Sequence, residues 1–166
     1  MHTTLLTTKL HVPLPCQTLV PRPRLTTILS KALTRRLTLV SAPAGYGKTT
    51  LVSNWLRETD VPAAWLSLDE GDNDPARFIE YFITALHRII PAIPVDLPGR
   101  FQGMQPAPFG TLMLLLINEI SEQTAPLVLV LDDFHAIHAE SILEMLASFL
   151  EHMPPQMHLI KVDPIV

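Results

Sequence analysis

The chain contains two kinds of segment, which alternate along the sequence. In one kind the apolar residues recur with a helical period, and the other kind is a short, mostly apolar run. In the helical pattern, apolar side chains recur at i, i+3, i+4 and i+7, which places them on one face of a helix. This pattern predicts helices at residues 25–33, 49–57, 76–90, 109–123 and 140–151. The short runs are typical of strands, and the run at residues 127–131, which has no alternation, is typical of a strand covered on both faces. They predict strands at residues 37–40, 63–68, 127–131 and 157–162.

The alternation of strands and helices predicts an α/β fold. Strands separated by helices are joined by right-handed crossovers, which give a parallel sheet between two helical layers. We therefore expect a three-layer α-β-α sandwich. Residues 1–33 are predicted to form an extended arm with a short helix, and residues 34–166 the sheet-containing domain.

Proline and acidic residues mark the connections. Residues 11–24 contain four prolines, and residues 91–108 contain five prolines and two glycines. Both segments are expected to be irregular. Asp74 followed by Pro75 predicts a helix start, and Pro91 its end. The acidic run 69–74 lacks the order of ligands of a calcium loop, so we interpret it as a solvated loop with a helix cap.

Composition and charge exclude several functions. The 166 residues carry a formal net charge of -4, so no overall basic field attracts DNA. A single cysteine, Cys16, cannot form an internal disulfide. No apolar run is long enough for a membrane span, and no signal peptide is indicated. We expect a cytoplasmic protein that by itself binds neither DNA nor membranes.

A glycine-rich loop lies between the first predicted strand and the following helix. Residues Ala42–Thr49 read A-P-A-G-Y-G-K-T and fit the phosphate-loop (Walker A) pattern, with Ala42 in place of the more common glycine. Glycines let successive backbone N–H groups approach phosphate oxygens. The predicted nucleotide-binding residues are Ala42, Pro43, Ala44, Gly45, Tyr46, Gly47, Lys48, Thr49 and Thr50. Lys48 would contact the β and γ phosphates and Thr49 the Mg²⁺ ion.

Two aspartates follow the most apolar predicted strand. The run L-V-L-V-L ends in Asp132 and Asp133, as a Walker B strand does. Asp132 is predicted to hold Mg²⁺, in part through water. Asp133 is predicted to orient or deprotonate the attacking water, which makes it a catalytic candidate together with Lys48. The fold class is therefore predicted to be that of a P-loop NTPase, with ATP or ADP and Mg²⁺ as cofactors.

These motifs resemble the N-terminal ATPase module of the MalT-like, LuxR-type transcriptional activators, which belong to the STAND class of P-loop ATPases. The resemblance extends to the arm, to the segment Trp65–Phe78 (W-L-S-L-D-E-G-D-N-D-P-A-R-F) and to Leu129–His135 (L-V-L-D-D-F-H). It implies an ADP/ATP switch that self-associates in its ATP form. It also implies that Arg22 or Arg24 lies over the base or ribose. The alternative for these arginines is a solvated basic pair.

The chain also departs from the family. The sensor and helix-turn-helix domains of the family are absent from these 166 residues, and the strand after Walker B lacks the family's γ-phosphate-sensing arginine. Lys161 stands in that strand, at a position expected to be buried. These departures lead us to expect a truncated or frame-shifted fragment, incomplete at its C-terminal end, with weak or absent hydrolysis.

Other interpretations remain open from the sequence. The chain could be an interaction module that modulates full-length relatives, a small-molecule kinase-type enzyme, or an unproductive product that does not fold stably. His135 and His138 have H-x-x-H spacing but no third ligand nearby, so a metal site there is not expected.

Overall fold

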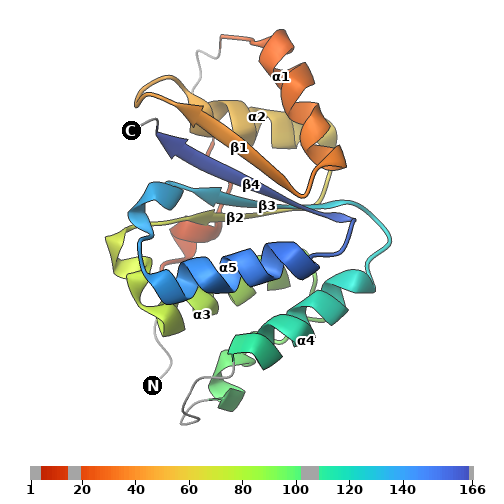
Figure 1. Cartoon of the computed structure of the whole chain (residues 1–166). Coiled ribbons are helices and arrows are strands. Elements are labelled where there is room, and N and C mark those ends of the chain that lie inside the picture. The colour runs from red at the N-terminus through yellow and green to blue at the C-terminus, as the bar shows by residue number, and fades with distance from the viewer. Residues whose placement is uncertain (1–4, 15–19, 102–108, 165–166) are drawn as a thin grey trace.

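A four-stranded parallel sheet forms the centre of the molecule. The computed structural model describes residues 5–14, 20–101 and 109–164. The strand order is β1-β4-β3-β2, and every neighbouring pair is parallel (Figure 1). The strands are β1 (Leu37–Ala42), β2 (Ala63–Ser67), β3 (Leu127–Asp132) and β4 (Met157–Pro164). The carboxyl ends of β1 and β3, which carry the two predicted motifs, therefore lie at the same edge of the sheet.

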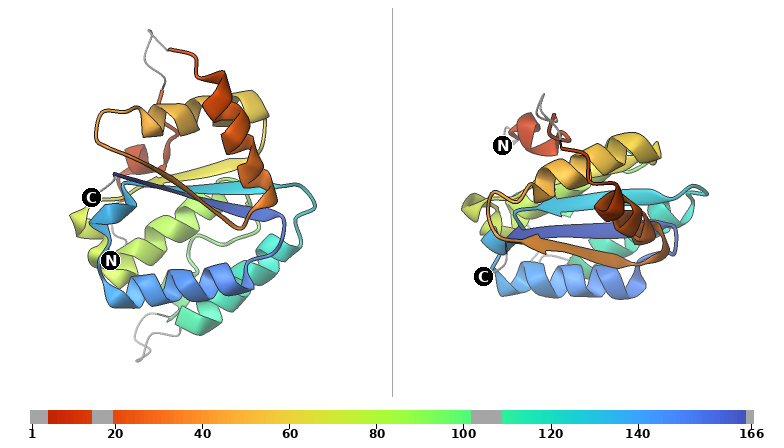
Figure 2. Two further views of the ribbon diagram at one scale, coloured as in Figure 1. Left: turned by 45° about the horizontal axis from the view of Figure 1, so that its top comes forward. Right: turned by 90° about the horizontal axis from the view of Figure 1, so that it is seen from above.

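Helices cover both faces of this sheet, as Figure 2 shows from above. One layer consists of α1 (Pro23–Leu29) and α2 (Lys48–Thr59). The opposite layer consists of α3 (Pro75–His87), α4 (Phe109–Ser121) and α5 (Glu140–His152). Short 3₁₀ helices are η1 (Thr7–Leu10), η2 (Ser30–Thr34), η3 (Glu70–Asn73), η4 (Pro98–Phe101) and η5 (Phe134–Ala136). The predicted three-layer α-β-α sandwich is confirmed.

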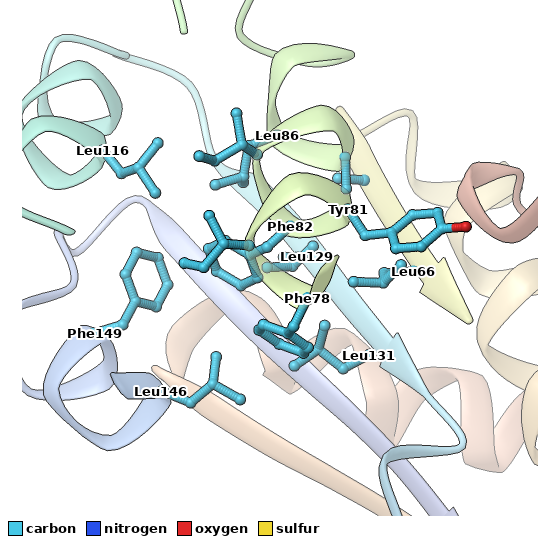
Figure 3. Packing of buried hydrophobic residues seen from close by; sticks show 14 of the residues in the cluster. Leu66, Phe78, Tyr81, Phe82, Leu86, Leu116, Leu129, Leu131, Leu146 and Phe149 are labelled. Carbon is cyan, nitrogen blue, oxygen red and sulfur yellow. The ribbon is translucent and has the colours of Figure 1, made fainter. Parts of the chain in front are cut away.

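The larger core lies between the sheet and α3, α4 and α5. Phe82 packs edge-to-face on Phe149 with ring centroids 5.4 Å apart, and it stacks on Phe78 at 5.8 Å (Figure 3). Leu129 and Leu131 of β3 extend into the same cluster. Burying a large apolar side chain stabilises a fold by roughly 1.5–3 kcal/mol. This cluster therefore holds α3 and α5 against the sheet.

The smaller core lies under α1 and α2. Trp55 and Trp65 are wholly or almost wholly buried there. Each indole N–H has a partner, since Trp55 donates to the Ser30 hydroxyl at 3.1 Å and Trp65 to the Ser67 hydroxyl at 2.9 Å. Satisfied indoles can be buried without a desolvation penalty. Trp55 thereby ties the end of α1 to α2.

Most predicted elements are confirmed, with shifts at some ends. The predicted helix 25–33 begins at Pro23, and its last turn is the 3₁₀ helix η2. The predicted helix 76–90 ends at His87, before Pro91. There the His87 ring nitrogen Nδ1 bonds to the Ile93 carbonyl at 2.7 Å, which favours a turn over continued helix. Parts of both proline-rich segments, residues 15–19 with Cys16 and residues 102–108, lie outside the described residues.

The expectation that Lys161 would be buried without a partner is wrong. Its side chain is 31% exposed, and its ammonium lies 2.9 Å from the Asp163 carboxylate. The same ammonium lies 4.2 Å from the centre of the Phe134 ring. An ion pair and a cation–π contact both stabilise the charge. Strand β4 therefore accommodates this lysine at the edge of the larger core.

The interpretation of residues 69–74 as solvated is wrong for one residue. Asp72 is fully buried, whereas Asp74 caps α3 as predicted by accepting from Arg77 N at 2.8 Å. The Asp72 carboxylate accepts hydrogen bonds from Lys9 of the arm and from Arg77. Lys9 also bonds to Asp69 at 2.7 Å, which lowers the pKa of Asp69. This cluster fastens the arm to the connection between β2 and α3.

No helix among the described residues is both long and apolar enough to cross a membrane.

Replacing Lys9 by alanine should lower the free energy of unfolding by about 3 kcal/mol, because the buried Asp72 would lose one of its two cations. Urea denaturation followed by circular dichroism measures this change. Arg100→Ala is the matched control, since Arg100 pairs with Asp96 and both side chains are more than half exposed. The Arg100→Ala variant should lose less than about 1 kcal/mol of the free energy of unfolding. If both variants lost the same free energy of unfolding, the claim that Lys9 stabilises the buried Asp72 carboxylate would be contradicted.

Candidate functional site

The glycine-rich loop connects the carboxyl end of β1 to the first turn of α2. Gly45 and Gly47 adopt φ angles of +81° and +75°, which residues with a Cβ rarely adopt. Among the described residues, an added Cβ at either position would meet no atom within 4 Å. The glycines are therefore required by the backbone conformation rather than by packing. Gly47 is also the N-cap of α2, so the loop leads into the positive end of a twelve-residue helix.

Lys48 is the first residue of α2 and turns back toward the loop. Its ammonium donates to the carbonyl oxygens of Ala42 at 2.7 Å and Pro43 at 3.0 Å. The side chain is half-buried. A lysine ammonium is a compact point charge on a flexible stem. The structure thus places a cation at the mouth of the loop, on a side chain long enough to change partners.

Thr49 joins the loop to the predicted Walker B strand. Its hydroxyl donates to both carboxylate oxygens of Asp132, each at 3.1 Å, across 83 residues of sequence. Asp132 is the last residue of β3 and is 4% exposed. The structure therefore brings together Lys48, Thr49 and Asp132, which the sequence assigned to phosphate and metal binding.

The environment of Asp132 disfavours its negative charge. Burial and the neighbouring charge of Asp133 raise the pKa of Asp132 to about 6. Hydrogen bonds from the Thr49 hydroxyl and the Asp133 N–H, together with the charge of Lys48, act in the opposite direction. A buried carboxylate of this kind is stabilised as an anion when a cation lies beside it.

The donor set at this point fits a hard divalent cation. Thr49 and Asp132 offer oxygen atoms, the ligand type that Mg²⁺ prefers. Mg²⁺ is commonly bound by one or two protein groups together with substrate phosphates and water. The described residues contain no group of three or more His, Cys, Asp and Glu side chains placed to hold a metal ion. Thr49 and Asp132, whose oxygen atoms meet at one point, are the candidate Mg²⁺ ligands.

Asp133 follows directly and has an unusual backbone. Its φ angle is +54°, in the left-handed region, and its side chain is exposed. Its backbone N–H donates to the Asp132 carboxylate at 3.1 Å. The side chain is therefore open to solvent, and its role toward an attacking water molecule stays a prediction.

The two arginines of the arm differ in position. Arg22 donates from Nη1 to the Tyr46 carbonyl of the loop at 3.1 Å. Arg24 is exposed on α1, and no hydrogen bond or ion pair of its side chain is found in the part of the chain that the structure describes. Beside Arg22, an open groove of about 420 Å³ runs between α1 and α2, and its lining includes Thr26, Asn54 and Glu58. The arm therefore reaches the loop through Arg22.

The sequence did not point to Asn73. Its side chain bonds to the segment that follows Asp133, through the Ala136 carbonyl and the backbone N–H groups of His138 and Ala139. These partners are more than 60 residues away in sequence. No local signal in residues 69–74 reveals such contacts. His138 itself is exposed and lies 3.7 Å from Glu70.

Comparison with known proteins finds a matching family model and similar sequences. A family model described as an AAA domain matches residues 31–162. The HTH-type transcriptional regulator MalT of Serratia proteamaculans is 41% identical over 157 residues, and that of Yersinia enterocolitica is 39% identical over 156. Each alignment covers 94% of this chain but only 17% of the relative. The predicted resemblance to a MalT-like ATPase module is confirmed.

A solved structure supports the fold independently. The Walker-type ATPase of Pyrococcus abyssi superimposes with a TM-score of 0.53 over 86% of this chain and 45% of its own. The sequences are 19% identical, so the likeness concerns the fold alone. It confirms the P-loop NTPase fold class.

Asp132→Asn should raise the free energy of unfolding at pH 7.5 by about 1–2 kcal/mol, measured in urea with EDTA. The variant removes a charge that burial disfavours. The folded pKa of about 6 lies above the unfolded value of 3.8, so the protonated Asp132 carboxyl contributes stability to the wild type that is fully present below pH 4. The wild type loses this contribution as the pH rises through 6. The stability difference between the two proteins should therefore be small near pH 4.

Asp96→Asn is the control for this comparison. A hydrogen bond from Arg100 lowers the pKa of Asp96, so removal of this exposed carboxylate should give no gain in stability at pH 7.5. If Asp132→Asn gained the same stability at both pH values, the raised pKa of Asp132 would be contradicted.

Proposed function

Because this chain belongs to the AAA domain family, we propose that it binds ATP and ADP with Mg²⁺ and serves as the nucleotide-dependent ATPase module of a MalT-like transcriptional regulator. The observation that carries this proposal is the contact between Thr49 and Asp132 beside Lys48. It brings the two motifs together at one edge of the sheet, which supports binding of phosphate and Mg²⁺ at that place. The names of the similar relatives supply the regulatory context.

Phosphate binding would rest mainly on backbone groups. The loop conformation at Gly45 and Gly47 leads into the N-terminus of α2, where N–H groups without helical partners can donate to an anion. Lys48 would exchange its two carbonyl partners for phosphate oxygens. Arg22, which is bonded to the loop at Tyr46, would contact the base or ribose.

The two aspartates would have different roles, since Asp132 would bind the metal and Asp133 would act in hydrolysis. Bound Mg²⁺ would neutralise phosphate charge, and Thr49 and Asp132 are the residues that would hold it. Asp133 would accept a hydrogen bond from the attacking water, since its carboxylate is exposed. We propose that hydrolysis is weak and that the exchange of ADP for ATP acts as a switch.

Lys48→Ala should weaken ATP binding about 10- to 100-fold, because a charge-assisted hydrogen bond contributes roughly 1.5–3 kcal/mol. Equilibrium binding of labelled ATP with Mg²⁺ measures the affinity. Lys31→Ala, on an exposed lysine of η2, is the matched control and should bind as the wild type does. Wild-type affinity in Lys48→Ala would refute the assignment of the site.

A second candidate function is nucleotide-dependent association with copies or longer relatives of this chain. Strand β1 is an edge strand in the described sheet, and the side chains of Leu37 and Leu39 are 45% and 59% exposed. An open, apolar sheet edge favours pairing with another chain.

Analytical ultracentrifugation tests this association. We expect a larger species with Mg-ATP than with Mg-ADP, and we expect Leu39→Lys to abolish it because a charge on the edge opposes pairing. A monomer under all conditions would exclude this second function.

A further inference from the structure

Asn73 uses its whole side-chain amide in hydrogen bonds. Its Nδ2 group donates to the carbonyls of Glu70 at 3.1 Å and Ala136 at 2.7 Å. Its Oδ1 atom accepts from the backbone N–H groups of His138 at 2.8 Å and Ala139 at 2.9 Å. An amide has two donors and two acceptor positions, so all four are satisfied. Three of these four bonds hold the segment that follows Asp133.

The 3₁₀ helix η3, which carries Asn73, is itself fixed in place. The Asp69 carboxylate accepts from Gly71 N at 2.9 Å, and the buried Asp72 carboxylate accepts from Asp69 N at 2.9 Å. Lys9 and Arg77 bond to Asp72 from the arm and from α3. Asn73 therefore lies on a segment that is held in place, and it can restrain the backbone groups to which it bonds.

The restrained segment begins with the left-handed residue Asp133. A non-glycine residue in this conformation costs on the order of 1–3 kcal/mol and persists only when its surroundings hold it there. On one side the turn is closed by the bond from Ala136 N to the Asp133 carbonyl at 3.0 Å, with Phe134 buried beneath. On the other side Asn73 holds Ala136, His138 and Ala139. These contacts fix the turn that begins at Asp133 and the segment that follows it.

This backbone conformation acts directly on Asp132. The Asp133 N–H donates to the Asp132 carboxylate at 3.1 Å, and that carboxylate also accepts from Thr49. This N–H belongs to the peptide between Asp132 and Asp133, whose orientation depends on ψ of Asp132 and φ of Asp133 together. If Asp133 left the left-handed region by a turn of that peptide, the N–H would leave the carboxylate, which would lose one of the bonds that orient it. The exposed Asp133 side chain would change direction as well.

We propose that Asn73 is the positioning residue for both aspartates, and that it sets the orientation in which Asp132 binds Mg²⁺ beside the nucleotide. This inference rests on the proposed function. A purely structural role for Asn73, as an anchor for the start of α5, would weaken all nucleotide binding together. A positioning role changes only the part of the affinity that depends on the metal.

Asn73→Ala tests this difference through ATP affinity measured in Mg²⁺ and in EDTA. We expect the tightening of ATP binding by Mg²⁺ to fall about tenfold, as for other residues that orient metal ligands. The affinity in EDTA should stay within about twofold of the wild type. Asn118→Ala, on the exposed face of α4, is the matched control and should keep both affinities. Hydrogen exchange at the amides of His138 and Ala139 should become faster in Asn73→Ala alone.

Three results decide the inference. If Mg²⁺ tightened ATP binding equally in Asn73→Ala and in the wild type, the positioning role of Asn73 would be overturned and the proposed function would remain intact. If Asn73→Ala lost ATP affinity equally in Mg²⁺ and in EDTA, Asn73 would have a structural role only, which also overturns the positioning role. A wild-type chain that binds no Mg-ATP would overturn the proposed function itself. If Asn73→Ala does not melt cooperatively, Asn73→Ser, a smaller change that keeps a polar group, replaces it in the same comparison.

Discussion

The hydrogen bonds between the Thr49 hydroxyl and the Asp132 carboxylate join the start of α2 to the end of β3. They can form only because β4 lies between β1 and β3 and all three strands are parallel, which brings their carboxyl ends to one edge. Ligands of open α/β sheets bind at this edge. That strand order brings the phosphate-loop sequence and the candidate metal ligands Thr49 and Asp132 to one place.

The site is held together at a cost in stability. Asp132 is a buried acid beside a second acid, and Asp133 adopts a left-handed backbone. Neither feature favours folding, and such features concentrate where a ligand is bound. The surrounding structure offsets them through the cores on both faces of the sheet. Contacts from the arm and from η3 also reach the site and the segment that follows it.

Those parts of the site that depend on local sequence could be predicted. The loop conformation follows from Gly45 and Gly47, and the burial of β3 follows from its unbroken apolar run. The sheet order, however, depends on pairing between strands that are distant in sequence, which local patterns do not reveal. The family comparison supports the same fold through longer stretches of sequence than the motifs alone.

Features that depend on distant partners could not be predicted. Asp72 belongs to a run of acids that looks solvated, yet it is buried because Lys9 arrives from the arm 63 residues earlier. Asn73 looks like an ordinary loop residue, and its role emerges only when the segment after Asp133 packs beside it. Lys161 looks incompatible with a central strand, but Asp163 and Phe134 stabilise its charge. Long-range contacts of this kind leave no periodic signal.

A crystal structure of the chain with Mg²⁺ and a non-hydrolysable ATP analogue tests the central claim most directly. The account predicts that the phosphates lie on the backbone N–H groups of residues 45–49, that Lys48 has left the carbonyls of Ala42 and Pro43 for a phosphate oxygen, and that Mg²⁺ lies between Thr49 and Asp132. A nucleotide bound elsewhere, with Lys48 still on those two carbonyls, would contradict it.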